Sequence, residues 1–271
     1  MRRPRGLLLE LGRLPYLEAW ELQRELVARR RAGAIPDALI LLEHPPTYTI
    51  GRSGTAASVL IDRAAREAAG IELIESDRGG DATYHGPGQV VGYPIVDLRA
   101  RGGDVHRYLR EVEEILLRTL ADFGLDGQRD GRYTGVWVGD AKVAAIGVKV
   151  SGGVTSHGFA LNVDPDFEHW AGIVPCGIHD RGVTSLARLL GRRPSPRRLR
   201  AALARHAGEV FGLSWRRATT ACHPEWAAAG PGSAVPDCHP ERSRCHPSLR
   251  SGQALRALAL PQEDLTHGVR A

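Results

Sequence analysis

The chain has 271 residues, of which 42% are hydrophobic and 25% are charged, a composition that suits one large globular domain or two small ones. The net charge of +5 favours acidic partners but does not mark a nucleic-acid-binding protein, because no basic run is interleaved with aromatic residues. The longest apolar runs are too short for a membrane span, and the N-terminal run at residues 7–9 is too short for a signal sequence.

The predicted elements mix helices and strands. The apolar spacing predicts a helix that begins after Pro15 and a strongly amphipathic helix that begins near Asp104, and Gly139-Asp140 predicts a tight hairpin turn. The predicted helices cover residues 16–31, 104–123 and 195–211. The predicted strands or extended segments cover residues 38–42, 47–52, 71–74, 89–98, 135–138, 143–148 and 157–163. This pattern predicts a mixed α/β (α+β) domain.

Lysine is scarce in this chain. Of 36 Lys and Arg residues, only Lys142 and Lys149 are lysine. Arg stays charged at any workable pH, whereas a lysine amine can give up its proton in suitable surroundings. Lys142 follows the hairpin turn at the start of an apolar strand, where its amine can face a partly dry site, so we favour it as the working amine. Lys149 has the pattern of an ordinary strand residue.

A glycine-rich segment lies between two predicted strands. It runs Arg78-Gly79-Gly80-Asp81-Ala82-Thr83-Tyr84-His85-Gly86-Pro87-Gly88-Gln89. Glycines let a backbone approach a ligand closely, and the side chains of Arg78, Thr83, His85 and Gln89 add hydrogen-bond donors. The segment is either a pocket wall or a turn between strands. It is neither a Walker loop nor a dinucleotide-binding fingerprint, because the required spacing is absent.

Cys176 is the third candidate, within Ile173-Val174-Pro175-Cys176-Gly177-Ile178. A lone cysteine in an apolar setting is commonly a small buried hydrophobe. Here Pro175 and Gly177 indicate an irregular segment instead, and a thiol beside a lysine ammonium would have a lowered pKa and act as a nucleophile. The sequence alone leaves open whether Lys142 reaches this thiol.

The chain changes character after about residue 217. Cys-His-Pro recurs there, starting at Cys222, Cys238 and Cys245, among Ala, Gly, Ser, Pro and Arg residues. The spacing does not match a zinc site, so residues 217–271 are predicted to be a poorly ordered extension of a domain at 1–216. Four cysteines concentrated towards the C-terminus do not form a disulfide framework, and we expect a cytoplasmic protein.

In combination, these segments resemble the lipoyl(octanoyl) transferase family. The resemblance runs from about residue 7 to about residue 215 and includes the glycine-rich segment, the Lys-Val-Ala-Ala-Ile-Gly strand and Pro-Cys-Gly-Ile. Further matching segments are Pro15–Trp20, His44–Thr49, Ser156–Val163 and Val183–Leu186.

The resemblance implies a fold like the catalytic domain of biotin and lipoate protein ligases. It implies transfer of an octanoyl group from octanoyl-acyl carrier protein to a lysine of lipoyl domains, those of the 2-oxoacid dehydrogenase acyltransferase subunits and the glycine cleavage H protein, without cofactor or metal. Cys176 would be the acyl-thioester nucleophile, and Lys142 would lower the pKa of that thiol and shuttle protons. The residues expected to bind substrate are Arg78, Gly79, Gly80, Asp81, Ala82, Thr83, Tyr84, His85, Ala145, Ile146, Gly147, Gly158, Phe159 and Ala160.

Two alternatives stay open at this point. An ATP-dependent lipoate or biotin ligase could use a similar glycine-rich loop and lysine. A non-catalytic acyl-carrier-binding module could carry the same segments without turnover.

Overall fold

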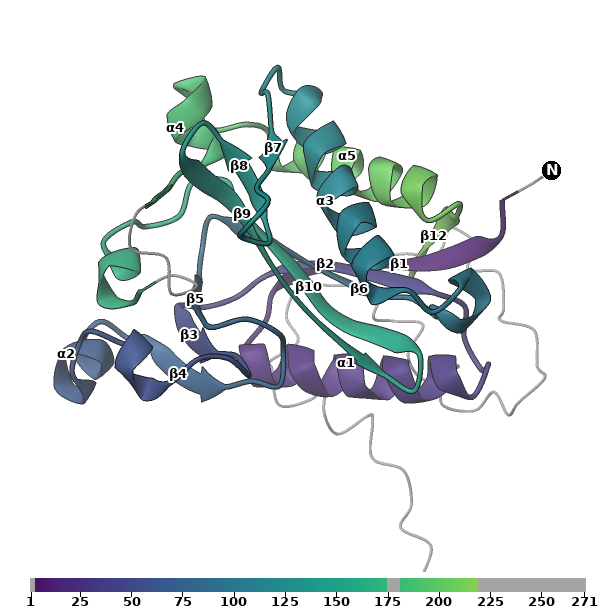
Figure 1. Ribbon diagram of the computed structural model, residues 1–271, viewed down its shortest axis with the longest axis horizontal. Coiled ribbons are helices and arrows are strands. Elements are labelled where there is room, and N and C mark those ends of the chain that lie inside the picture. The colour runs from purple at the N-terminus through teal and green to yellow at the C-terminus, as the bar shows by residue number, and fades with distance from the viewer. Residues whose placement is uncertain (1–2, 175–180, 219–271) are drawn as a thin grey trace, which may run out of the picture. The chain divides into compact units, whose positions relative to one another are not determined.

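A computed structural model describes residues 3–174 and 181–218 (Figure 1). The helices are α1 (Tyr16–Arg31), α2 (Arg63–Ala68), α3 (Val105–Ala121), α4 (Leu186–Leu190) and α5 (Pro196–Val210), and short 3-10 helices cover Ala56–Ser58, Arg99–Arg101 and His169–Gly172. The strands are β1 (Arg5–Arg13), β2 (Ala38–Glu43), β3 (Thr47–Ile50), β4 (Glu72–Glu75), β5 (Ala82–His85), β6 (Gln89–Ile95), β7 (Gln128–Arg129), β8 (Val136–Val138), β9 (Ala141–Ser151), β10 (Val154–Asn162), β11 (Gly182–Val183) and β12 (Ser214–Ala218).

A large mixed sheet forms the centre of the described part of the chain. Its strand order is β12-β1-β2-β6-β10-β9-β8-β7, and β11 pairs with β9. Strand β1 lies parallel to β12 and β2, whereas the pairs from β2 to β7 are antiparallel. A smaller sheet has the order β4-β3-β5. The predicted mixed α/β fold is therefore confirmed.

Helices cover both faces of the large sheet (Figure 1). On one face, α3 and α5 pack together over a core that includes Val112, Leu116 and Leu203. On the other face, α1 packs against β10 and β6. Burial of each aliphatic side chain of this core stabilises the folded state by about 1.5–3 kcal/mol.

Local signals explain where the longer helices begin. The Asp104 carboxylate accepts a hydrogen bond from the Arg107 amide at the start of α3, and the Ser195 hydroxyl accepts one from the Arg198 amide at the start of α5. Pro196 occupies the first turn of α5, where its missing amide hydrogen costs nothing. The three predicted helices are confirmed, α1 with identical bounds.

Several elements differ from the prediction. Strand β1 was not predicted, and the glycine-rich segment contains a strand, β5, which pairs antiparallel with β3. The predicted boundary after residue 216 falls inside β12, which pairs with β1 at the sheet edge.

Within the described residues, no helix combines the length and apolar character needed to cross a membrane. Cys176 and the segment from 219 to 271 lie outside the described residues.

Candidate active site

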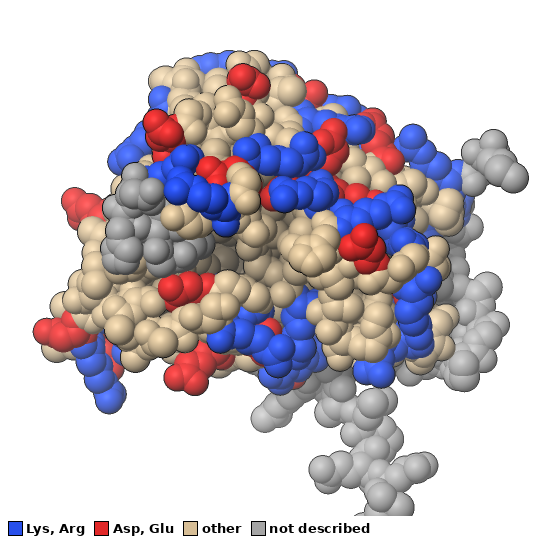
Figure 2. Space-filling view, viewed as in Figure 1, with Lys and Arg blue, Asp and Glu red and all other residues tan. Residues whose placement is uncertain are grey.

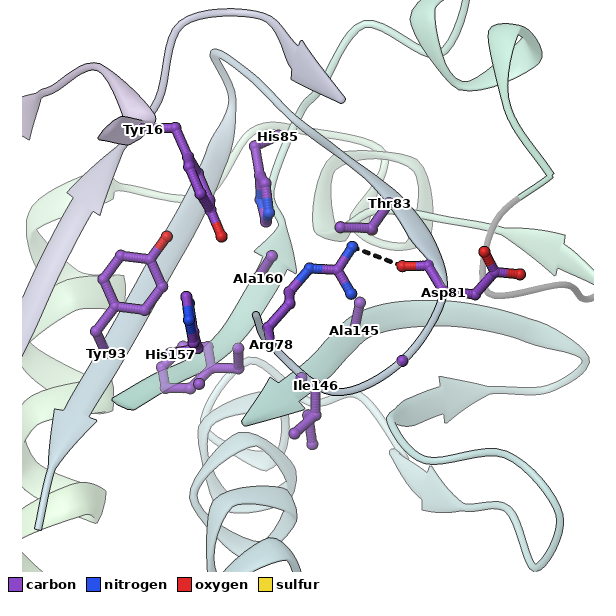
Figure 3. A pocket seen from close by; sticks show the side chains of 14 residues that line it. Tyr16, Arg78, Asp81, Thr83, His85, Tyr93, Ala145, Ile146, His157 and Ala160 are labelled. Atoms are coloured by element: carbon purple, nitrogen blue, oxygen red, sulfur yellow. Dashed lines mark hydrogen bonds between the residues drawn. The ribbon is translucent and has the colours of Figure 1, made fainter. Parts of the chain in front are cut away.

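A pocket opens beside the β9–β10 hairpin (Figure 3). The pocket is partly open to solvent. The hairpin, the glycine-rich segment, the start of α1 and β6 all contribute to its wall. The lining residues are Tyr16, Arg78, Gly80, Asp81, Thr83, His85, Tyr93, Ala145, Ile146, Gly147, His157, Gly158, Phe159 and Ala160.

Small residues let the glycine-rich segment approach the hairpin. Gly147 pairs with Gly158, and Ala145 pairs with Ala160, across β9 and β10. A Cβ atom at residue 147 would lie 2.7 Å from the carbonyl oxygen of Gly79, a distance that real side chains do not tolerate. The close approach is therefore possible only because residue 147 is glycine.

Arg78 organises the glycine-rich segment from inside. Its guanidinium donates hydrogen bonds to Thr49 Oγ1, to the Thr49 carbonyl at 2.7 Å and to the Asp81 carbonyl at 2.7 Å. The Arg78 side chain is buried, and hydrogen bonds are stronger in the low dielectric constant of a protein interior than in water. Arg78 thus lines the pocket while much of its hydrogen-bonding capacity holds the loop in shape.

Two other side chains of this segment present unused polar atoms. Thr83 Oγ1 and His85 Nδ1 are buried and have no hydrogen-bond partner among the described residues. Burial lowers the pKa of His85 well below its ordinary value, with the nearby His44 and Arg78 adding to the effect, so the ring is neutral at pH 7. Unpaired buried polar atoms are rare in proteins, so these two mark a part of the pocket wall whose hydrogen bonds the described residues do not complete.

Eleven of the fourteen residues expected to bind substrate line this pocket, and Gly79, Ala82 and Tyr84 do not. Gly79 instead donates its amide hydrogen to the Val148 carbonyl, which attaches the loop to β9. Tyr84 points into a separate core cluster, and its hydroxyl lies 2.8 Å from His169 Nδ1. Strand alternation in β5 explains this, since Thr83 and His85 face the pocket and Tyr84 faces away.

Tyr16, Tyr93 and His157 also line the pocket, although they are not among the residues that were expected to bind substrate. His44 fixes the Tyr93 hydroxyl behind the wall. Its Nδ1 lies 2.7 Å from the Leu14 carbonyl, which can only accept, so Nδ1 carries the hydrogen and Nε2 accepts from the Tyr93 hydroxyl at 2.7 Å. Tyr16 and His157 lie in segments that resemble the family, but no pattern in the sequence predicts that the three aromatic side chains share one wall of a pocket.

His157 forms a chain of charged contacts with Asp77 and Lys149. The Asp77 carboxylate lies 2.8 Å from His157 Nε2 and 2.5 Å from Lys149 Nζ. Partial burial alone would raise the pKa of Asp77, but these two hydrogen bonds outweigh it and hold that pKa below its ordinary value. Lys149 was interpreted as an ordinary strand residue; the structure shows a half-buried lysine in an ion pair with a residue 72 positions away.

Lys142 lies on β9, three residues before the pocket residue Ala145. It is buried, and its Nζ lies 4.9 Å from the centroid of the Trp137 ring. Lys142 pairs with Val183 of β11, and its carbonyl accepts a hydrogen bond from the Thr184 amide. The described residues give Lys142 no carboxylate partner.

In residues 3–174 and 181–218, no group of three or more His, Cys, Asp or Glu side chains is arranged to hold a metal ion.

The chain is similar in sequence to octanoyltransferases of bacteria. The octanoyltransferase of Rubrobacter xylanophilus is 59% identical over 183 residues, which are 67% of this chain and 82% of that protein. That of Chloroflexus aurantiacus is 52% identical over 209 residues, 76% of this chain and 94% of that protein.

Solved structures show the same fold. A bipartite lipoate protein ligase from Thermoplasma acidophilum has a TM-score of 0.61 at 19% identity, covering 80% of this chain and 88% of the ligase. LipL1 of P. falciparum in complex with lipoate has a TM-score of 0.62 at 16% identity, covering 78% of this chain and 66% of LipL1. The sheet and helices therefore have the arrangement of a lipoate protein ligase catalytic domain.

The family model of the lipoyl protein ligase A/B catalytic domain matches residues 15–208. This match begins just before α1, ends within α5 and includes every residue that lines the pocket. Together with the sequence identities, it shows that the chain belongs to the octanoyltransferase family of acyltransferases.

Proposed function

We propose that this chain transfers an octanoyl group from octanoyl-acyl carrier protein to a lysine amine of lipoyl domains, through a thioester on Cys176. The observation that carries the proposal is the position of Lys142, a buried lysine without a carboxylate partner among the described residues, on β9 three residues before the pocket residue Ala145. The acceptors are the lipoyl domains of 2-oxoacid dehydrogenase acyltransferase subunits and the glycine cleavage H protein.

The chain on both sides of Cys176 supports its pairing with Lys142. Val174 donates its amide hydrogen to the Ser58 carbonyl at 2.9 Å. On the other side, Arg181 lies over the Trp137 ring at 5.2 Å from its centroid, on the ring that Lys142 also contacts. Val183, seven residues after Cys176, pairs with Lys142 itself. A segment with these ends can bring a thiol beside the Lys142 amine.

The proposed first step moves the acyl group onto the protein. The Cys176 thiolate attacks the thioester carbonyl of the carrier, a new carbon–sulfur bond forms, and the bond to the carrier sulfur breaks. The Lys142 ammonium gives its proton to the departing carrier sulfur and becomes neutral. One thioester is exchanged for another, so the step is nearly isoenergetic and needs no ATP.

The second step returns both residues to their starting state. The acceptor lysine amine attacks the Cys176 thioester, an amide bond forms, and the carbon–sulfur bond to Cys176 breaks. Neutral Lys142 takes the proton that the attacking amine must lose. The cycle ends with a Cys176 thiolate and a Lys142 ammonium, and an Arg at position 142 could not complete it.

The surface agrees with acidic protein substrates. Figure 2 shows Lys and Arg side chains in a band across one face, interspersed with acidic side chains, above a hollow. Residues from 217 onward hold 6 Arg and 5 acidic residues, so +4 of the net +5 belongs to residues 1–216. Such an excess accelerates encounter with acidic partners more than it tightens the complex. We propose a cytoplasmic location, because the acyl carrier protein and the acceptor domains must be present in the same compartment as this chain.

The test is acyl transfer in purified components. The 271-residue chain is incubated with octanoyl-acyl carrier protein and a lipoyl domain, without ATP, and the lipoyl domain is weighed by intact mass. We expect the lipoyl domain to gain one octanoyl group, and no gain from the carrier in the absence of ATP would overturn the proposal.

An ATP-dependent ligase is the second candidate, because the chain shares its fold with a lipoate protein ligase solved with ATP, at a TM-score of 0.61. The same assay separates the two. Transfer from free octanoate that requires ATP and survives alkylation of Cys176 would favour the ligase.

A further inference from the structure

The backbone of His157 turns its side chain toward the pocket. Among the described residues, His157 is the one residue other than glycine in the left-handed region, with φ of 55°. Strand alternation would place it with Phe159 and Leu161, which face the core under α3 and α5. Its ring instead lies near Trp20 and Tyr93 on the α1 side of the sheet. Such backbone strain persists only where neighbouring groups hold it.

Three polar residues hold His157 in this position. The buried side chain of Gln23, on α1, accepts a hydrogen bond from the His157 amide at 2.7 Å. Asp77 accepts one from His157 Nε2, and Lys149 donates one to the same carboxylate. Because a carboxylate only accepts, Nε2 carries the hydrogen of the neutral ring and Nδ1 is left as an acceptor. Burial lowers the pKa of His157, which favours this neutral ring.

His157 Nδ1 has no partner among the described residues and is fully buried. The neighbouring hydroxyl groups are already engaged, Tyr93 with His44 and Tyr16 with Ser76 at 2.8 Å. In Figure 3, Tyr16, Tyr93 and His157 gather at one end of the pocket, and Thr83 and Asp81 lie at the other. One end of the pocket is therefore a rigid polar wall.

The spacing along the hairpin fits an octanoyl chain. Lys142, Ala145 and Val148 follow one another on β9, and Val148 pairs with His157. Three residues of strand separate Ala145 from Val148, a span of about 10 Å. An extended octanoyl group, with seven carbon–carbon bonds of about 1.5 Å in a zigzag, reaches about 9 Å. A carbonyl near the Lys142 side of Ala145 would thus place the terminal methyl group near His157.

We propose that His157 is the end wall of the acyl pocket and limits the length of the acyl chain, with Asp77 and Lys149 as positioning residues that fix its ring. This inference rests on the proposed octanoyl transfer. A longer chain would press its last methylene groups against the buried ring of His157, which cannot move aside because Gln23 and Asp77 hold it in place.

The experiment compares acyl donors of different length. Values of kcat/KM are measured with octanoyl-, decanoyl- and dodecanoyl-acyl carrier protein for the full chain and for His157→Gly and His157→Asn, since both replacements accept a left-handed backbone. One methylene group in a fitted pocket changes selectivity by tenfold or more. We therefore expect His157→Gly to raise the decanoyl-to-octanoyl ratio of kcat/KM by about tenfold or more, and His157→Asn to raise it less.

The positioning residues are tested with matched pairs of variants. Lys149→Arg keeps the ion pair with Asp77 and should keep the wild-type ratio, whereas Lys149→Met and Asp77→Asn should raise it by a few fold. Ser156→Ala, next to His157 on β10, is the control and should leave the ratio unchanged. Melting temperatures identify variants that fold.

Two results would overturn the inference in distinguishable ways. A decanoyl-to-octanoyl ratio within twofold of wild type in folded, active His157→Gly and Asp77→Asn would overturn the end wall and leave octanoyl transfer standing. Absence of transfer by the wild-type chain from every donor would overturn the proposed function and this inference with it.

Discussion

Lys142 Nζ lies 4.9 Å from the centroid of the Trp137 ring, in a buried position without a carboxylate partner among the described residues. The aromatic face stabilises the ammonium without neutralising it by a fixed negative charge. An ammonium held in this way remains available to pair with a thiolate. In the proposed mechanism, one of the two lysines of the chain therefore occupies the position that must exchange a proton, which charge alone cannot do.

Replacement of Lys142 by Arg separates charge from proton exchange. The guanidinium can also lie over Trp137, so we expect the melting temperature to change little. We expect kcat for octanoyl transfer to fall by about 100-fold or more, the usual effect of losing a general acid–base group. Steady-state kinetics beside thermal melting would check this, and turnover near the wild-type rate would rule out the proton-transfer role.

The contact between Gly147 and the Gly79 carbonyl predicts a sensitive site in the pocket. Gly147→Ala would place a methyl group 2.7 Å from that oxygen and push the glycine-rich segment away. We expect a loss of about 1–3 kcal/mol in the free energy of unfolding, together with weaker acyl-donor use. Urea denaturation and kcat/KM measure the two effects.

Gly131→Ala is the matched control for that substitution, since an added Cβ meets no atom within 4 Å and the backbone there is not left-handed. It should leave the free energy of unfolding and kcat/KM near wild type. Equal effects of the two substitutions would show that the contact at Gly147 is unimportant.

The buried histidines predict loss of stability in acid. Burial lowers the pKa of His44 from 6.5 to about 4 in the folded chain. Between these values the unfolded chain binds a proton at this ring that the folded chain does not, so the free energy of unfolding falls as pH decreases from about 6.5 to about 4. His44 alone accounts for about 3 kcal/mol of this fall, and His85 and His157 shift in the same direction.

Urea denaturation at several pH values between 7 and 4 would measure this dependence. His44→Asn keeps an amide donor for the Leu14 carbonyl but removes the titrating ring. We expect a smaller loss of stability over this pH range in the variant, and an unchanged slope would count against the assignment.

The sequence predicted elements whose patterns are local. Residues 16–31 carry their helical spacing and their Pro15 start within one segment, and the turn at Gly139-Asp140 joins β8 to β9 as expected. Strand β1 was missed because its pairing with β2 and β12 is parallel and non-local. Strand β5 was missed because glycines surround it, which hides its alternation.

The pocket residues also differ in whether a local sequence pattern could predict them. The glycine-rich segment and the small residues of β9 and β10 carry a motif, and most of them line the pocket. His157 could not be found by alternation, because its left-handed backbone reverses the face to which its ring points. Lys149 lies on strand β9 as predicted, but its ion pair could not be predicted, since its partner Asp77 comes from another part of the chain.

Intact mass of the full chain after incubation with octanoyl-acyl carrier protein, without an acceptor, tests the central claim most directly. We predict a gain of one octanoyl group that disappears in Cys176→Ser, persists in Cys222→Ser and is discharged when a lipoyl domain is added. Full transfer activity in Cys176→Ser, or an adduct that persists in that variant, would contradict the thioester mechanism.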